Sequence, residues 1–312
     1  MKLTTSFAST SVCIASVGRR TLIELVLSLY KNSYSLLDFF ICIPDDISVD
    51  LVDRLHRLPS TRLIYTSVRN QVYQRHLAIS HVTRPYVLQL DDDVVIDSDS
   101  LHNLFLAHHN QPFGSATSPL LITHDRRSFF SPIATGQPGN YISHFRAKAI
   151  AFLLGYPEVL DDKLLYGRIS KSGVPVGVPY DPSLELSLLL EVEFLSGCCM
   201  LLPTLYAQID NYYPFQQGRA SLEDLFHSKY LTSRAGLGLY MVTNSYLSLE
   251  VSDGRASDWA NLRNLTQALP RQLEFNRTYG YSCSHYLLFY FAYSLMLSFR
   301  LFFGFLIVPF RS

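Results

Sequence analysis

The strongest constraint on the fold is an alternation, through the first ninety residues, of short apolar runs and longer amphipathic segments. Four apolar runs, rich in β-branched and aromatic residues, predict strands at residues 10–16, 38–43, 62–66 and 86–90. Three segments between them carry apolar residues at helical spacing and predict helices at residues 21–31, 49–58 and 71–80. Strands separated by such helices form βαβ units, whose parallel sheets are covered by helices on both faces. The sequence therefore predicts an α/β fold with a central, mostly parallel sheet.

Clusters of carboxylates follow two of the predicted strands. Asp45 and Asp46 come directly after the second strand, and Asp91, Asp92 and Asp93 come directly after the fourth. Ligands of open α/β sheets bind at the carboxyl ends of the strands. Adjacent carboxylates repel one another unless a cation lies among them, and Mg²⁺ or Mn²⁺ prefers oxygen ligands. The triplet is thus a candidate metal site, and the alternative is a solvated acidic turn.

Composition narrows the class of protein. A hydrophobic fraction of 48% and a charged fraction of 17% exclude wholesale disorder in a chain of 312 residues. The formal net charge is zero, so no basic field indicates a nucleic-acid partner. The five cysteines lack paired CxxC spacing and are expected to be reduced, mostly buried thiols. The polar N-terminus lacks a signal-peptide core, so we expect a cytoplasmic protein.

Residues 8–245 resemble a family 2 glycosyltransferase with the GT-A fold, the Rossmann-like fold of nucleotide-diphospho-sugar transferases. The loop "IPDDISVD" matches the acidic loop that holds the nucleotide base in this family, with Asp45 and Asp46 as the acidic pair and Ile47 in place of the usual glycine. The segment "RNQVYQRHLAIS" places Arg75 where the family arginine approaches the nucleotide. The alternative is that Arg75 is an ordinary exposed helix residue.

The resemblance extends to the aspartate triplet, which matches the family's DxD motif. It implies that Asp91 and Asp93 hold Mn²⁺ or Mg²⁺ and that Asp91 and Asp92 lie at the nucleotide. A divalent cation between the two phosphates offsets the charge that develops on the leaving nucleotide. Many members add a histidine ligand on a later strand, but "MVTNSYLSLEVSDG" has none, and Glu250 or Asp253 would have to replace it.

Two segments of the second half continue the resemblance. Residues 191–203, "EVEFLSGCCMLLP", are similar to the strand beneath the donor sugar, where Gly197 permits close backbone approach; the alternative is a plain buried strand. The pair Glu223 and Asp224 matches the "ED" pair whose carboxylate faces the acceptor hydroxyl. The resemblance implies an inverting displacement with Asp224 as general base and Glu223 as the alternative. A helix start capped by Ser221 would equally explain the acids.

Two other functions remain open. "LQLDDDVV" also fits the first motif of haloacid-dehalogenase-type phosphatases, with Asp91 as nucleophile and Asp93 as acid. That motif usually lies on the first strand, and Asp161 and Asp162 precede Lys163 in the wrong order for this family. The other alternative is a catalytically inactive GT-A domain that serves as a membrane scaffold, which the altered acidic loop and the missing histidine would explain.

The C-terminal part of the chain is the most hydrophobic. Residues 278–299 contain no Asp, Glu, Lys or Arg. A helix here can lie at the membrane surface, span the bilayer or close the core. We expect a GT-A domain over residues 1–260, with its nucleotide half at 1–110 and its acceptor half at 111–260, followed by a hydrophobic helical segment at 261–312. The implied partners are a nucleotide-sugar donor, a saccharide or lipid-linked acceptor in surface polysaccharide or glycolipid synthesis, and a membrane that the protein meets peripherally or through a C-terminal anchor.

Overall fold

The structure is a computed structural model that describes residues 8–31, 37–111, 114–122, 167–178, 187–208, 222–249 and 258–307. The chain divides into two compact units. The first consists of Met1–Phe129 and Tyr180–Glu250, and the second of Phe130–Pro179 and Val251–Ser312.

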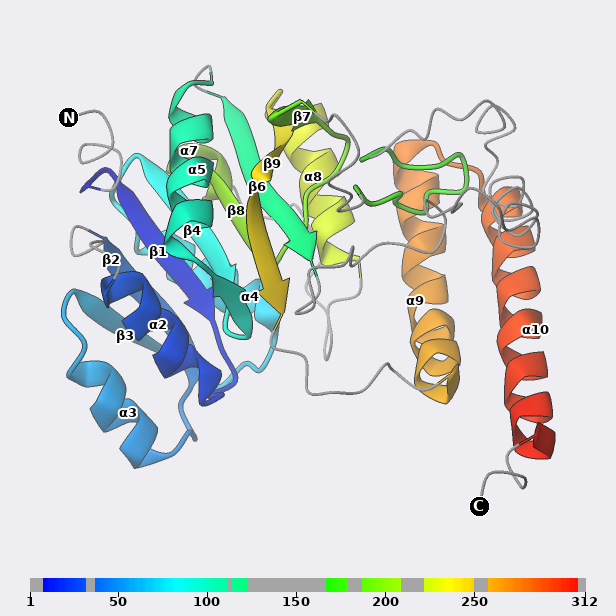
Figure 1. The fold of residues 1–312 in the computed structure, drawn as a ribbon, viewed down its shortest axis with the longest axis horizontal. Helices are drawn as coiled ribbons and strands as arrows, with labels where there is room; N and C mark the ends of the chain where they lie inside the picture. Colours follow the sequence, from blue (N-terminus) through cyan, green and yellow to red (C-terminus); the bar gives the residue numbers. More distant parts are fainter. Residues whose placement is uncertain are drawn as a thin grey trace. The chain divides into compact units, whose positions relative to one another are not determined.

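The first unit is built on one mixed sheet of nine described strands (Figure 1). Eight of them follow one another in the order β3 (Thr61–Thr66), β2 (Asp38–Pro44), β1 (Thr10–Ala15), β4 (Tyr86–Asp91), β8 (Cys199–Pro203), β6 (Ser115–Ile122), β9 (Gly238–Leu249) and β5 (Val94–Ile96). The ninth strand, β7 (Leu189–Glu191), pairs with β9. The first four strands in this order are parallel, and β8 joins them to the rest through antiparallel pairing with β4 and β6.

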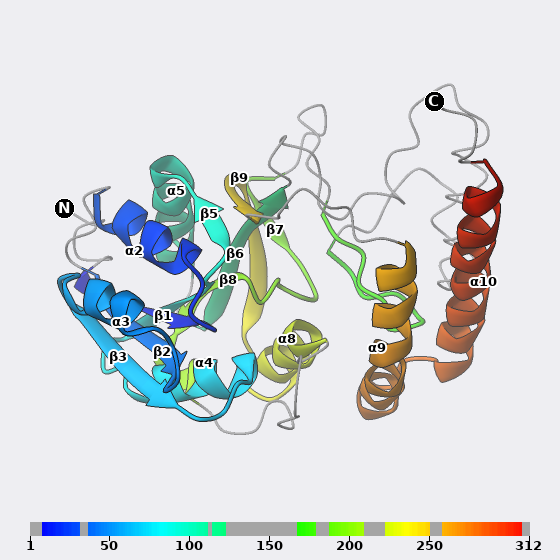
Figure 2. The ribbon, with the colours of Figure 1, turned by 90° about the horizontal axis from the view of Figure 1, so that it is seen from below.

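Helices cover both faces of this sheet. They are α2 (Thr21–Lys31), α3 (Val49–His56), α4 (Gln71–Ser80), α5 (Ser98–His109), α7 (Thr204–Ala207) and α8 (Glu223–Ser233). Figure 2 shows α2 and α5 on one face and α4 and α8 on the other. Side chains fix where three of them begin, because Ser48, Asn70 and Asp97 each accept a hydrogen bond from a backbone N–H in the first turn of α3, α4 and α5.

The apolar runs of the sequence form the core of this unit. Strands β1, β6 and β8 are buried along their whole length, β2 is buried except at its first residue, and β4 is buried except at its two ends. All seven elements predicted for the first ninety residues are present, with ends that agree to within two residues. The predicted α/β class with flanking helices is confirmed. The strand expected within residues 191–203 is present as β8, but the sequence did not predict its antiparallel pairing with β4 and β6, nor the short strand β7.

The second unit contains two long helices, α9 (Asp258–Tyr279) and α10 (Cys283–Ile307), which pack against each other. Residues 167–178 belong to this unit and form a turn on α9. Gln272 Nε2 donates to the carbonyl of Gly173 at 2.9 Å, and Asn276 Nδ2 donates to the carbonyl of Ser172 at 2.8 Å. Gly173 has φ +79°, and a Cβ there would lie 1.9 Å from Asn276 Oδ1. The turn therefore requires glycine at this position.

Within the range 261–312, for which a hydrophobic helical segment was predicted, the structure describes most of α9 and all of α10, with a short turn at residues 280–282 between them. In that described part of the chain, no helix reaches the combination of length and hydropathy that a membrane span requires. The domain boundary near residue 260 stays a prediction.

Candidate active site

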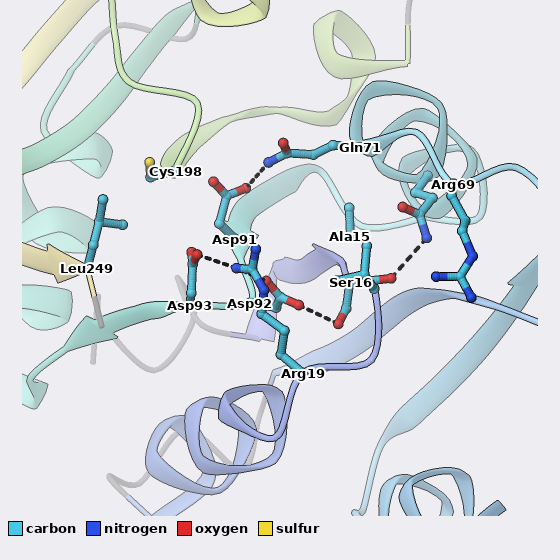
Figure 3. Close-up of a pocket in the computed structure, with 12 residues that line it drawn as sticks. Ala15, Ser16, Arg19, Arg69, Gln71, Asp91, Asp92, Asp93, Cys198 and Leu249 are labelled. Atoms are coloured by element: carbon cyan, nitrogen blue, oxygen red, sulfur yellow. Dashed lines mark hydrogen bonds and ion pairs between the residues drawn. The ribbon is translucent and has the colours of Figure 1, made fainter. Parts of the chain in front are cut away.

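A pocket of about 490 Å³ lies at the carboxyl ends of β1 and β4. These strands are parallel neighbours with Ala15 opposite Asp91, so the loops that follow them meet at one edge of the sheet. The pocket is lined by Ala15, Ser16, Val17, Arg19, Arg69, Gln71, Gln74, Asp91, Asp92, Asp93, Cys198 and Leu249 (Figure 3). A pocket thus lies at the edge of the sheet where the sequence predicts the ligand site.

Asp92, the middle residue of the triplet, ties the two loops together. Its Oδ2 accepts from Ser16 Oγ at 2.5 Å and its Oδ1 from Arg19 Nη1 at 3.1 Å, while Thr21 Oγ1 donates to its carbonyl oxygen at 2.7 Å. Only 5% of Asp92 is exposed, and burial raises the pKa of its carboxyl against the opposing effects of Ser16 and Arg19. Both carboxylate oxygens are therefore occupied by protein donors, although the sequence placed Asp92 among the nucleotide-binding residues.

The carboxylates of Asp91 and Asp93 have fewer protein partners than that of Asp92, because only one oxygen of each is bonded among the described residues. Asp91 Oδ1 accepts from Gln71 Nε2 at 2.7 Å and from Arg75 Nη2 at 2.8 Å. Asp93 Oδ2 is paired with Arg19, whose guanidinium lies between Asp92 and Asp93 (Figure 3). Among the residues that the structure describes, Oδ2 of Asp91 and Oδ1 of Asp93 accept no hydrogen bond. One oxygen on each outer carboxylate thus remains for a ligand in the pocket.

Arg75 lies beneath the pocket and not in its lining. Its side chain is fully buried, and besides Asp91 it pairs with Glu223 Oε2 at 2.6 Å and donates to the carbonyl of Gly197 at 3.3 Å. The interpretation of Arg75 as an ordinary exposed helix residue is wrong. The buried guanidinium lies between two carboxylates and joins the segment Asp91–Asp93, called the aspartate loop below, to the start of α8. This position favours an indirect role of Arg75 over direct contact with the nucleotide.

The acidic loop after β2 lies at the edge of the site. Asp45 and Asp46 are both exposed, and neither is among the residues that line the pocket. Asp46 pairs with Arg69 Nη2 at 2.6 Å, and this hydrogen bond lowers the pKa of the Asp46 carboxyl. Arg69 itself lines the pocket. Through Arg69, Asp46 therefore influences the charge of the pocket, while binding of a base by this loop stays a prediction.

Helix α8 presents the "ED" pair beside the pocket wall. The helix begins at Glu223, and its N-cap residue Leu222 is left-handed with φ +65° and makes no side-chain cap. A Cβ on Gly197 would lie 2.5 Å from Glu223 Oε1 and 3.6 Å from Asp224 Cβ, and the next residue, Cys198, lines the pocket. Ser221, the alternative cap, lies outside the described residues. The close approach at Gly197 thus brings both acids near the pocket.

The two acids of the pair have different surroundings. Glu223 is buried and neutralised by Arg75. Asp224 is half-buried, and burial first and the neighbouring Glu223 second raise the pKa of its carboxyl to about 7, while the N–H of Leu225, 2.9 Å from Oδ1, acts in the opposite direction. A carboxylate with a pKa near 7 accepts a proton better than one with the ordinary value. Asp224 is therefore the better candidate for a base.

Comparison with known proteins identifies the fold. No protein-family model matches the chain, and no curated protein matches it in sequence. The mannosyltransferase PcManGT from Pyrobaculum calidifontis, solved with GDP-Man and Mn²⁺, is similar in structure with a TM-score of 0.51 and 13% identity over 85% of this chain. GalNAc-T7, solved with UDP, GalNAc and Mn²⁺, gives 0.50 and 14% over 92% of this chain. This chain has the GT-A fold.

The GT-A match is to part of each longer protein. The chain covers 64% of the length of PcManGT and 57% of that of GalNAc-T7. The resemblance to GT-A enzymes that was expected from the sequence is confirmed at the level of the fold, and the fold gives no support to the haloacid-dehalogenase alternative. At these identities the comparison establishes the fold alone.

The donor atoms of this GT-A site suit a divalent cation only in part. The free oxygens of Asp91 and Asp93 are hard ligands of the kind that Mg²⁺ and Mn²⁺ prefer. No group of three His, Cys, Asp or Glu able to hold a metal occurs within the described ranges. Burial raises the pKa of the Cys198 thiol well above its usual value, so it remains protonated. Glu250 and Asp253, the predicted substitutes for histidine, lie outside the described residues. The carboxylates thus fit a cation whose remaining ligands are water and phosphate oxygens.

Of the residues that contact the triplet, Arg75 was identified from the sequence, whereas Ser16, Arg19 and Gln71 were missed. Ser16 and Arg19 lie 76 and 73 residues before Asp92 in the chain, and Gln71 lies 20 residues before Asp91. The signal that could have found Ser16 and Arg19 is their position directly after the first strand. In a parallel sheet whose first and fourth strands are neighbours, that loop meets the loop with the triplet.

Proposed function

We propose that this chain is a metal-dependent, inverting glycosyltransferase that uses a nucleotide-diphospho-sugar donor. The observation that carries the proposal is the pocket on a GT-A fold in which three carboxylates and two arginines, Arg19 and Arg69, face the same space. A nucleoside diphosphate together with a divalent cation presents charges of both signs to such a lining. The nucleotide, sugar and Mn²⁺ that are named for the two similar structures support this class of ligand.

Asp91 and Asp93 are the residues that would hold Mn²⁺ or Mg²⁺, each through one carboxylate oxygen. When bound, such a cation offsets the negative charge that develops on the departing diphosphate. The half-exposed guanidinium groups of Arg19 and Arg69 contribute further positive charge at the same pocket. Asp92 keeps the two loops in place, because both of its oxygens are used within the protein.

Asp224 is the proposed general base. It accepts the proton of an acceptor hydroxyl as that oxygen attacks the anomeric carbon, and the attack from the side opposite the nucleotide inverts the configuration. Its pKa of about 7 allows it to be ionised at neutral pH and still to bind a proton during the reaction. Glu223 is less suited, because its carboxylate is paired with the buried Arg75. Arg75 and Glu223 are positioning residues that connect Asp91 with α8, the helix that carries Asp224.

The acceptor is proposed to be a saccharide or a lipid-linked saccharide, and helix α10 to lie at the membrane surface. Four apolar side chains form one exposed stripe on this helix, namely Leu288, Phe291, Leu295 and Phe299. A stripe of this kind can bury its rings at the headgroup level. Truncation after Gly280 should then release the protein from vesicles and keep nucleotide binding. A truncated chain that becomes insoluble, while the full chain is soluble without detergent, would instead make α10 a core helix.

A transfer assay tests the proposal. The full chain is incubated with Mn²⁺ and with UDP-, GDP- and dTDP-sugars, and release of the nucleoside diphosphate is followed with and without saccharide acceptors. Asp224→Asn should lower turnover about 10²- to 10⁴-fold with near-normal nucleotide affinity, whereas Glu223→Gln should have the smaller effect. Nuclear magnetic resonance of the product gives its anomeric configuration. Nucleotide binding without turnover would favour the inactive scaffold, and a retained configuration would overturn the inverting mechanism.

A further inference from the structure

Arg19 is positively charged, and its guanidinium is paired with carboxylates of the aspartate loop. Its Nη1 pairs with both Asp92 and Asp93 (Figure 3). Asp93 has no other hydrogen-bond donor or cation within the described part of the chain. In the absence of a metal ion, Arg19 therefore compensates the charge of Asp92 and Asp93, while Arg75 is the cation paired with Asp91.

The two arginines that contact the triplet differ in how easily they can leave. The side chain of Arg75 is fully buried and is held by Asp91, Glu223 and the carbonyl of Gly197, so its removal would leave two carboxylates unpaired. The side chain of Arg19 is 48% exposed, and its partner Asp93 is 33% exposed. Ion pairs at such exposure contribute about 1 kcal/mol or less. Arg19 is thus the exchangeable cation of the site and Arg75 the fixed one.

A divalent cation on Asp93 and the guanidinium of Arg19 compete for the same carboxylate. Two positive groups at one carboxylate also repel each other, since unit charges 4 Å apart interact by about 1 kcal/mol even in water. A diphosphate in the pocket changes this balance, because its oxygens accept charge-assisted hydrogen bonds from a guanidinium. Arg19 would then have a second anionic partner within the same pocket.

We propose that Arg19 is an internal competitor of the metal: it holds Asp93 when the pocket is empty and transfers to the diphosphate when the donor binds, so that metal and nucleotide bind together. This inference rests on the proposed function, because it takes the ligand to be a nucleoside diphosphate with a divalent cation. By linkage, the nucleotide strengthens metal binding by the same factor by which the metal strengthens nucleotide binding. Few protein ligands are then needed, in agreement with the two free oxygens on Asp91 and Asp93.

The test is the affinity of the full chain for Mn²⁺ alone, measured by electron paramagnetic resonance of the free ion at fixed ionic strength. Arg19→Gln removes the competitor and should tighten Mn²⁺ binding by roughly tenfold. Arg69→Gln is the matched control, because Arg69 lines the same pocket and is similarly exposed but pairs with Asp46, outside the triplet. It should change the Mn²⁺ affinity by about twofold or less. Arg19→Lys keeps the charge and should leave Mn²⁺ binding as weak as in the wild type.

The same titrations are then repeated with UDP or GDP present. The nucleotide should strengthen Mn²⁺ binding by a larger factor in the wild type than in Arg19→Gln, because only the wild type has to move Arg19. Equal or weaker Mn²⁺ binding by Arg19→Gln in the absence of nucleotide would overturn the inference, as would a lack of Mn²⁺ binding by all variants. Failure of every nucleotide to bind would contradict the proposed function, whereas the comparison with Mn²⁺ alone would still report on Arg19. Circular dichroism of each variant verifies that the loss of contact with Asp92 has not unfolded the chain.

Discussion

The environment of Asp224 predicts how the stability of this protein depends on pH. Its carboxyl has a pKa of about 7 in the folded chain against an ordinary value of 3.8. Because the folded pKa is the higher one, the unfolded chain releases this proton first as the pH rises, and the free energy of unfolding falls between about pH 4 and pH 7. The difference between these two pKa values corresponds to about 4 kcal/mol, and since Asp224 is only half-buried we expect roughly 2–4 kcal/mol.

Asp224→Asn keeps an oxygen for the N–H of Leu225 but removes the ionisation. Urea unfolding of the wild type and the variant at pH 4 and pH 8 gives the difference directly. The variant should gain roughly 2–4 kcal/mol relative to the wild type over this interval, and the contributions of titrating groups that do not interact with Asp224 cancel in the comparison. Asp50→Asn, an exposed carboxylate in the first turn of α3, is the control for loss of an acid near a helix start. Parallel pH dependences for the wild type and Asp224→Asn would refute the assignment of a raised pKa to Asp224.

Two further predictions concern stability and are measured by urea unfolding at pH 7. Arg75→Met should cost about 3–5 kcal/mol, because it leaves Asp91 and the buried Glu223 without their cation, and adding Glu223→Gln should recover part of the loss. A cost below about 1 kcal/mol would show that Arg75 does not stabilise the link between Asp91 and the start of α8. Gly173→Ala should cost about 1–3 kcal/mol more than the control Gly280→Ala. Both glycines have φ +79°, but only a Cβ at position 173 would meet neighbouring atoms. Equal costs would contradict the packing of Gly173 on Asn276.

The sequence predicted the elements and the edge of the sheet that carry the site, because these depend on local patterns. β-branched runs, helical spacing and the acids after strands all lie within short windows, and the structure has each of them within two residues of its expected place. The triplet was identifiable for the same reason. Asp91, Asp92 and Asp93 are consecutive, so the need for a compensating cation is evident without knowledge of the fold.

The partners of these acids could not be predicted, because they come from distant parts of the chain. Arg75 and Glu223 are separated by 148 residues. The antiparallel strand β8 lies beside β4 and brings the segment with Gly197 close to Asp91, and Gly197 in turn lies against Glu223 at the start of α8. The different roles of the three aspartates also depend on this arrangement. Identical side chains in consecutive positions point in different directions, so that both oxygens of the nearly buried Asp92 are used within the protein, while each neighbour keeps one oxygen without a partner among the described residues.

Calorimetric titration of UDP, GDP and dTDP, with and without Mn²⁺, tests the central claim that the aspartate pocket binds a nucleoside diphosphate through a divalent cation. The wild type should bind at least one of them more tightly with Mn²⁺ than without it. Asp93→Ala should lose this gain, because no neighbour can replace the free oxygen at that position, and Asp53→Ala, which removes an exposed acid on α3, should retain it. Nucleotide binding that is indifferent to Mn²⁺ or unchanged in Asp93→Ala would contradict the account.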